Sequence, residues 1–390
     1  MNKRGTGALL AALIIIAAAV ATHAQEEPHP LAQQLRLTLP PDIYAVPGHE
    51  VNIYFDNIVL SPDIDDLIFD VDCNRGRQDE KRWRYTPDGS TIGQFSLTVR
   101  VLAPDMELID EASTMIHVSP ADAGAGEEIS LLIVGDSLTN ATYYPREVYE
   151  LMQVEGNPEL TMIGSHAGGG KKPTDGVAHE GYGGWRWSTF CTRWGDDDPY
   201  GGKSRFLREI DGEPTLDFQH YLDTYSDAEA PDFITVLLGC NDTFSATEEE
   251  IEERIDDMFG WADKLLAEFQ QVAPDTQIGV LLLVPPSASQ DAFGSNYKCR
   301  QTRWQYRRNQ HRVVERQLEK FADSEDDNIF IVPANVNIDC EHNYPTRQEQ
   351  VNARNDTAIQ RPSNGVHPAP EGYYQIADSI YYWLKYRLSR

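Results

Sequence analysis

Ile-Ser-Leu-Leu-Ile-Val-Gly-Asp-Ser-Leu, residues 129–138, joins an apolar run to a polar turn. The run Ile129 to Val134 has the length and the branched aliphatic side chains of a buried β-strand. A serine placed where such a strand meets a helix lies near free backbone N–H groups and the positive end of the helix dipole, which stabilise developing negative charge. The stretch therefore predicts a nucleophilic serine, Ser137, at the carboxyl end of a strand.

Strands and helices are expected to alternate from this stretch to the C-terminus. Runs that predict strands lie at Ile129 to Val134, Leu160 to Ile163, Phe233 to Leu238, Gln277 to Val284 and Ile329 to Val332. The clearest helix opens with Thr247 and Glu250 as a capping box, and others are expected over Arg303 to Phe321 and Glu371 to Leu388. This alternation predicts a doubly wound α/β fold, with a parallel sheet covered on both faces and a site at the carboxyl ends of its strands.

The segment before residue 120 has a different, all-β pattern. Short alternating runs lie at Leu35 to Leu39, Val51 to Phe55, Leu67 to Val71, Gly93 to Leu102 and Thr114 to Val118. They predict a small β-sandwich domain over residues 33–119, joined by a linker of small residues to an α/β domain over residues 127–390. The β domain could bind glycan or brace its neighbour, and the second role is favoured because nothing in its sequence marks a binding site.

Three later segments carry polar residues that a parallel fold would bring to the edge of Ser137. They contain Gly184 in HEGYGGW (179–185), Asn241 in GCND (239–242) and His367 in NGVHP (364–368). Together with the GDSL tetrapeptide they resemble the four blocks of the SGNH, or GDSL, hydrolase superfamily, over roughly Glu127 to Arg390. The resemblance implies the flavodoxin-like sheet of the SGNH hydrolase fold.

The resemblance also implies roles for these residues. Ser137 would attack an ester carbonyl, His367 would act as its base, and the N–H groups of Ser137 and Gly184 with the amide of Asn241 would bind the oxyanion. The chemistry is coherent, because a serine hydroxyl needs a positioned imidazole and each oxyanion donor typically contributes about 3 kcal/mol. No pair of cysteines has zinc-site spacing, so we expect no metal and no cofactor.

One position departs from the family pattern, which has an aspartate three residues before the histidine where this chain has Asn364. Three interpretations stay open. Asn364 could orient His367 through its side-chain carbonyl, another acceptor such as a backbone carbonyl, Asp339 or Asp356 could do so, or catalysis could be impaired. An active Ser-His pair is favoured because every other block is intact.

Two inserts have unusual compositions. Ser165 to Lys203 is rich in glycine and aromatic residues, which could form a sugar-stacking platform, with Trp185 and Tyr182 as the substrate-binding candidates, or a small satellite core. Ser287 to Asn309 concentrates basic residues, which could contact a substrate carboxylate. For them, pairing with the acidic surface is favoured. The basic residues are Lys298, Arg300, Arg303, Arg307 and Arg308.

Residues 1–24 read as a signal peptide, with Lys3 and Arg4 before an apolar stretch and small residues before a cleavage site after Ala24. The apolar stretch is shorter than the roughly 20 residues that span a bilayer, which disfavours a stable membrane anchor. A secreted or periplasmic location is expected. In that oxidising compartment Cys299 and Cys340 are the expected disulfide among five cysteines.

The chain carries 62 acidic against 33 basic residues, a formal net charge of −29. Such a charge repels nucleic acid and anionic membranes, so neither is expected as a partner. The resemblance implies a serine ester hydrolase, and the expected export, the added β domain and the aromatic insert favour a secreted one that removes acetyl or other short acyl groups from a carbohydrate. The alternatives are a lipase or lysophospholipase, and a non-catalytic glycan-binding or surface protein that has lost the triad acid.

Overall fold

The computed structural model describes residues 35–62, 64–168, 171–173, 175–195 and 202–390. The predicted signal peptide lies outside these residues. Among the residues described, no helix is both long enough and apolar enough to cross a membrane.

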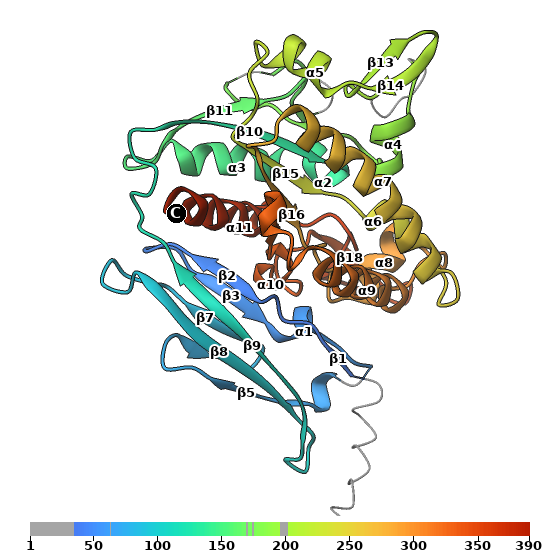
Figure 1. The fold of residues 1–390 in the computed structure, drawn as a ribbon. Helices are drawn as coiled ribbons and strands as arrows, with labels where there is room; N and C mark the ends of the chain where they lie inside the picture. Colours follow the sequence, from blue (N-terminus) through green and yellow to red (C-terminus); the bar gives the residue numbers. More distant parts are fainter. Residues whose placement is uncertain (1–34, 63, 169–170, 174, 196–201) are drawn as a thin grey trace, which may run out of the picture.

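A parallel sheet forms the centre of the second part of the chain (Figure 1). Its strands are β10 (Glu128–Gly135), β11 (Glu159–Ile163), β12 (Glu180–Gly181), β15 (Phe233–Leu237), β16 (Gln277–Leu281) and β17 (Ile329–Val332). The order β11-β10-β15-β16-β17 is 2-1-3-4-5 in chain order, the flavodoxin-like doubly wound arrangement. The predicted fold class is confirmed.

Strands β15, β16 and β17 are buried on both faces, as parallel strands covered by helices must be, whereas β11 at one edge is exposed on one face. The helices of this part are α2 (Ser137–Asn140), α3 (Tyr143–Met152), α4 (Trp187–Thr192), α5 (Phe218–Tyr225), α6 (Cys240–Thr243), α7 (Ile251–Val272), α8 (Gln290–Tyr297), α9 (Arg303–Phe321), α10 (Ala334–Asn337) and α11 (Pro370–Leu388). Helix α3 packs against α11, and α7 packs against α4, α5 and α9. Gly279 in β16 leaves room for Trp383 of α11, since an added Cβ would lie 3.0 Å from that ring.

Residues 36–118 form two small sheets that face each other. Their elements are β1 (Arg36–Leu37), β2 (Asp42–Ala45), β3 (Val51–Tyr54), α1 (Phe55–Ile58), β4 (Val59–Leu60), β5 (Ile68–Asp72), β6 (Arg77–Gln78), β7 (Arg82–Tyr85), β8 (Gly93–Leu102) and β9 (Leu108–Val118). One of the facing sheets has the order β2-β9-β8-β5 and the other β3-β7-β6, and β1 pairs with β4 in a separate two-stranded sheet. Rings meet between them, with Tyr85 edge-on to Phe95 and Phe55 stacked on Phe69.

Polar contacts tie this β unit to the α/β part. The amide of Asn57 donates to the carbonyl of Ile338 at 2.8 Å, and Arg303 of α9 forms a 2.9 Å ion pair with Asp56. The buried guanidinium of Arg307 donates to backbone carbonyls at the end of α1, those of Asp56, Asn57 and Val59. These contacts support the brace interpretation of the β unit.

The basic insert forms the expected ion pairs, whereas the cysteines do not form the expected disulfide. Pairing with acidic residues is confirmed for Arg303 and also for Arg308, which lies 2.9 Å from Glu248. The expected Cys299–Cys340 disulfide is wrong, because all five cysteines are free. Cys340 is buried and its thiol donates to Asn57 Oδ1 at 3.3 Å, whereas Cys299 is exposed in the loop after α8.

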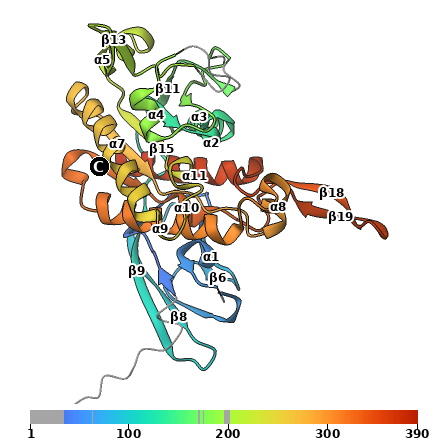
Figure 2. The ribbon, with the colours of Figure 1, turned by 90° about the vertical axis from the view of Figure 1, so that its right-hand side faces the viewer.

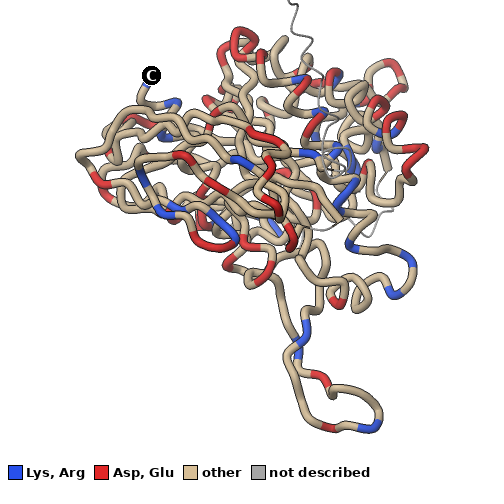
Figure 3. Tube along the Cα trace, turned by 90° about the horizontal axis from the view of Figure 1, so that it is seen from below, with Lys and Arg blue, Asp and Glu red and all other residues tan. Residues whose placement is uncertain are grey.

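A two-stranded hairpin, β18 (Thr346–Asn352) and β19 (Asn355–Pro362), projects from the body beside α8 (Figure 2). One of its faces carries Arg347, Glu349 and Arg361, and Arg361 reaches Asp291 of α8 at 3.0 Å. The other face is exposed and uncharged near the root, where it presents Thr346, Gln348, Gln350, Ala358 and Gln360. Charged residues of both signs occur along the projecting trace (Figure 3), so only the part of this face near the root is uncharged.

Candidate active site

Ser137 and His367 come together although 230 residues separate them in the chain. Ser137 begins α2 directly after β10, and His367 lies in the loop before α11. Nε2 of His367 is 2.8 Å from Oγ of Ser137, and both residues are half-buried. This distance allows direct proton transfer from the hydroxyl to the ring.

Burial also sets the charge of the ring. It lowers the pKa of His367 below its usual 6.5, because the charged imidazolium loses solvation in the protein. The ring is therefore neutral at neutral pH. A neutral imidazole can accept the proton of Ser137.

Asn364 supports His367 through the backbone. Its Oδ1 accepts hydrogen bonds from the N–H of Val366 at 3.1 Å and from the N–H of His367 at 3.0 Å. The expectation that its side-chain carbonyl orients the imidazole itself is therefore corrected: this oxygen is occupied by the main chain of the same turn. The turn, in consequence, fixes the position of the histidine's Cα.

The other acids considered for this role lie elsewhere. Asp339 accepts from Tyr54 OH at 3.3 Å and lies 3.0 Å from Nδ1 of His342. Asp356 is exposed on β19. Within the described part of the chain, no hydrogen bond to Nδ1 of His367 is present, so the interpretation that another acid replaces the triad aspartate finds no support.

Gly184 lies in the loop that follows β12. Strand β12 pairs with Val134 and Gly135 at the end of β10, two residues before Ser137. This pairing places the loop close to the serine. Gly181 permits the close approach, because a Cβ there would lie 2.5 Å from Thr139. Gly184 itself is exposed and has φ +74°, a conformation that favours glycine.

Asn241 follows β15 at the start of α6, on the same edge of the sheet. Its Nδ2 donates to Oδ2 of Asp136 at 3.2 Å and to the carbonyl of Trp185 at 3.0 Å. Both amide hydrogens thus have acceptors within the protein. An oxyanion would have to replace one of them, and the neutral Trp185 carbonyl is the weaker competitor.

Asp136 braces the site, as predicted. Its side chain is fully buried, caps α2 through the N–H of Leu138 at 2.9 Å, and accepts from the thiol of Cys240 at 2.9 Å as well as from Asn241. Burial raises its pKa to about 6, while these hydrogen bonds favour the charged form. Cys240 is a small buried residue, also as predicted, and burial raises the pKa of its thiol well above the usual value.

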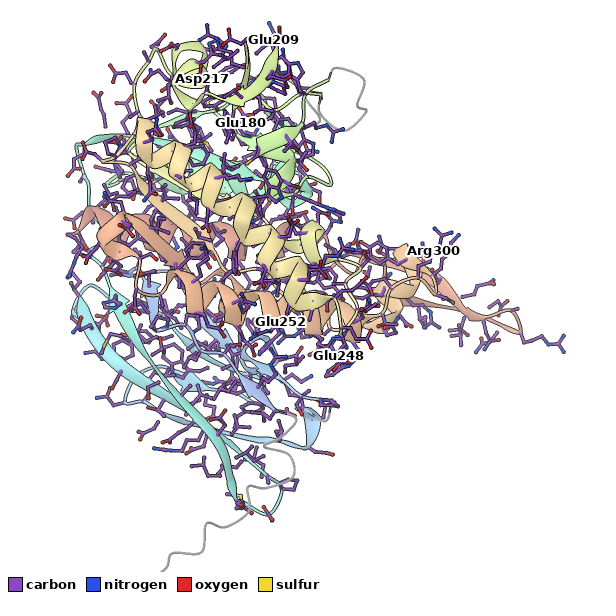
Figure 4. All side chains as sticks on the ribbon, turned by 45° about the vertical axis from the view of Figure 1, so that its right-hand side comes forward. Glu180, Glu209, Asp217, Glu248, Glu252 and Arg300 are labelled. Atoms are coloured by element: carbon purple, nitrogen blue, oxygen red, sulfur yellow. The ribbon has the colours of Figure 1, made fainter. Side chains whose placement is uncertain are left out.

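A second buried carboxylate, Glu180 of β12, was not predicted. It accepts hydrogen bonds from the N–H and hydroxyl of Ser165 at 2.5 and 2.9 Å, from Tyr182 OH at 2.5 Å and from Tyr221 OH at 2.9 Å. It lies inside the fold, whereas Glu209 and Asp217 lie nearer the periphery (Figure 4). Glu180 therefore joins three segments of the chain, those of Ser165, Tyr182 and Tyr221, and the segment of Tyr182 leads to Gly184.

Tyr182 and Trp185 do not form a surface platform. They are 5% and 1% exposed, stack on each other with ring centroids 3.9 Å apart, and pack against Phe190. The expectation that these two rings bind substrate is wrong, because neither has a face open to a ligand. They form the satellite core that was the other interpretation.

Across the described ranges, no group of three or more His, Cys, Asp or Glu side chains is arranged to hold a metal ion. The contact between Ser137 and His367 supplies a serine and an imidazole, and the loops of Gly184 and Asn241 carry hydrogen-bond donors to the same edge of the sheet. These are the components of acyl transfer through a covalent intermediate.

Comparisons with known proteins agree with this chemistry. A family model described as GDSL-like Lipase/Acylhydrolase matches residues 131–380. No curated protein matches the chain. Similar solved structures include a carbohydrate esterase family 3 from Talaromyces cellulolyticus, with 15% identity and a TM-score of 0.38, covering 67% of this chain and 98% of that one. A family 3 carbohydrate esterase from Clostridium thermocellum has 17% identity and a TM-score of 0.37, covering 68% and 100%.

Proposed function

Because the chain belongs to the GDSL-like lipase/acylhydrolase family and is an SGNH-type ester hydrolase, we propose that it is an exported carbohydrate esterase that removes acetyl or other short acyl groups. The observation that carries the proposed mechanism is the 2.8 Å contact between His367 Nε2 and Ser137 Oγ.

In the proposed reaction, His367 takes the proton of Ser137 as the oxygen attacks the ester carbonyl. The negative oxygen that forms is bound by the N–H groups of Ser137 and Gly184 and by the amide of Asn241. His367 then gives the proton to the sugar oxygen as the bond between that oxygen and the acyl carbon breaks, so the sugar leaves as an alcohol and the acyl group stays on Ser137. Attack by water, with the same base, releases the carboxylic acid and restores the serine.

Three features support a carbohydrate as the acyl carrier. The pattern of residues 1–24 supports export. The formal charge of −29 disfavours anionic lipid surfaces. The uncharged face of the β18–β19 hairpin, which leads into the loop of His367, offers amide groups that both donate and accept hydrogen bonds, as sugar hydroxyls do.

The test combines acyl-chain length with the nucleophile variant. Wild type and Ser137→Ala are compared on p-nitrophenyl esters of two, four and twelve carbons, and on acetylated polysaccharides with acetate as the readout. Wild type is expected to prefer the shortest ester and to release acetate, and Ser137→Ala to lose at least a thousandfold. A preference for the twelve-carbon ester would indicate a lipase, and equal rates in both proteins would overturn the proposed nucleophile.

A further inference from the structure

Tyr143 is an exposed ring next to the two segments that carry Ser137 and His367. It follows Ser137 by six residues, at the start of α3, and Tyr373 follows His367 by six residues, in the first turns of α11. The two rings stack, with centroids 5.4 Å apart and planes 22° apart. Tyr143 is 46% exposed, whereas Tyr373 is 2% exposed.

Tyr373 supports Tyr143 from the interior side. Its neighbour Gly372 lies against Pro368, the residue after His367, so closely that a Cβ there would be 2.7 Å from the proline ring. The pKa of Tyr373 is raised, mainly by burial and secondarily by the nearby charge of Asp136. The inner ring is thus close to the residue that precedes Ser137, and the outer ring stacks on it.

The turn that presents Tyr143 is held in an uncommon conformation. Thr142 has φ +67°, which is rare for a β-branched residue. Its hydroxyl lies 2.9 Å from Nε2 of the buried His179 and donates to the carbonyl of Asn140 at 3.2 Å. Beyond the turn, Tyr144 points inward with its hydroxyl 2.5 Å from that of Thr139, which directs Tyr143 outward.

Single exposed aromatic residues are common and need no explanation. Tyr143 differs because a strained turn and a buried ring hold it, and these belong to the segments that carry Ser137 and His367. A fixed ring loses little entropy when a ligand packs on it, and its free face suits a flat apolar surface whose edge is polar. The C–H face of a pyranose ring has this character.

We infer that the free face of Tyr143 stacks on the sugar ring that carries the scissile ester, or on the ring next to it. This inference rests on the proposed function. Tyr143 then takes the substrate-binding role that the burial of Tyr182 and Trp185 excludes for those rings. It is a specificity residue, since it would add affinity for acylated sugars and none for esters that lack a ring.

The experiment compares Tyr143→Ala and Tyr143→Phe with wild type on an acetylated oligosaccharide and on ethyl acetate. Ethyl acetate is used because the aromatic ring of a p-nitrophenyl ester could itself stack on Tyr143. The matched control is Tyr374→Ala, which removes a ring that is 40% exposed but lies about 100° further around α11 than Tyr373. Thermal unfolding of each variant reports whether the fold is retained.

Tyr143→Ala is expected to raise the KM for the oligosaccharide roughly threefold to tenfold, with kcat within twofold. Tyr143→Phe keeps the stacking face and should stay within twofold of wild type, as should Tyr374→Ala. Hydrolysis of ethyl acetate should change less than twofold in Tyr143→Ala.

An equal loss on both esters would overturn the inference, because Tyr143 would then act on the Ser137 turn itself. No change on the oligosaccharide, or the same change in Tyr374→Ala, would also overturn it. If wild type hydrolyses ethyl acetate and releases nothing from any acetylated sugar, the proposed carbohydrate substrate fails, and the stacking role fails with it. The wild-type result therefore separates the two failures.

Discussion

Substitution of Asn364 tests how an SGNH-type hydrolase with no triad aspartate at this position supports its histidine. Asn364→Ala removes the oxygen that accepts the N–H groups of Val366 and His367 at 3.1 and 3.0 Å. Each such bond contributes about 1 kcal/mol net, so the turn loses about 2 kcal/mol. If all of that loss falls on the alignment of the imidazole, kcat falls roughly 30-fold.

Asn364→Asp keeps an acceptor for both N–H groups and adds a negative charge near the ring. Because the side chain binds the backbone of the turn, we expect kcat/KM to change less than tenfold. The added carboxylate favours the imidazolium and raises the pKa of His367. The acid limb of the pH profile should therefore move to higher pH.

The assay measures kcat and KM for a two-carbon ester between pH 4 and 9, with thermal unfolding as the control for folding. An Asn364→Ala protein as active as wild type would refute the backbone role. A thousandfold gain in Asn364→Asp would also refute it, because the imidazole would then have lacked a carboxylate partner that the variant supplies.

Three further predictions follow from the site. Burial lowers the pKa of His367 below 6.5, and only the neutral ring accepts a proton. The value of kcat/KM should therefore be constant above that pKa and fall at lower pH, with a midpoint under 6.5. A midpoint above 7 would contradict this. Asn241→Ala should lower kcat roughly 10²- to 10³-fold with little change in KM, and a loss below tenfold would argue against an oxyanion role. Glu180→Gln should lower the free energy of unfolding by about 2 to 4 kcal/mol in urea titrations, since four hydrogen bonds to a buried carboxyl group are weakened. The control Glu209→Gln, at an exposed position, should stay within about 0.5 kcal/mol of wild type. Equal effects of Glu180→Gln and Glu209→Gln would contradict the role of Glu180 in joining three segments of the chain.

The sheet could be predicted because it follows from local patterns, and the convergence of Ser137 with His367 because the four motif blocks resemble those of the SGNH hydrolases. Apolar runs such as Ile129 to Val134 identify strands, and a parallel sheet brings the residues after its strands to one edge. Once Ser137 follows β10 and Asn241 follows β15, their proximity is a consequence of strand order. The loop of His367 precedes α11, and α11 packs against α3, the long helix that follows Ser137.

The supporting residues could not be predicted, because their roles depend on tertiary contacts. A glutamate between His179 and Gly181 gives no sign of burial, since its partners Ser165 and Tyr221 lie in other segments. Aromatic residues in a glycine-rich insert suit a surface platform as well as a small core, and only the stacking of Tyr182 on Trp185 decides between them. Tyr143 could not be singled out, because no feature of the sequence distinguishes it from its neighbour Tyr144.

The hydrogen bonds of Asn241 bear on how the proposed oxyanion hole would stabilise the transition state rather than the substrate. One hydrogen of its amide is held by the carboxylate of Asp136, which is itself fixed by Cys240 and by the N–H of Leu138. The other is directed at the neutral carbonyl of Trp185. An ester carbonyl, also neutral, has little advantage over Trp185 as an acceptor, whereas a developing oxyanion forms a stronger, charge-assisted bond. Replacement of the Trp185 carbonyl by the substrate oxygen therefore favours the transition state over the bound ester. Only interactions that are stronger in the transition state raise kcat.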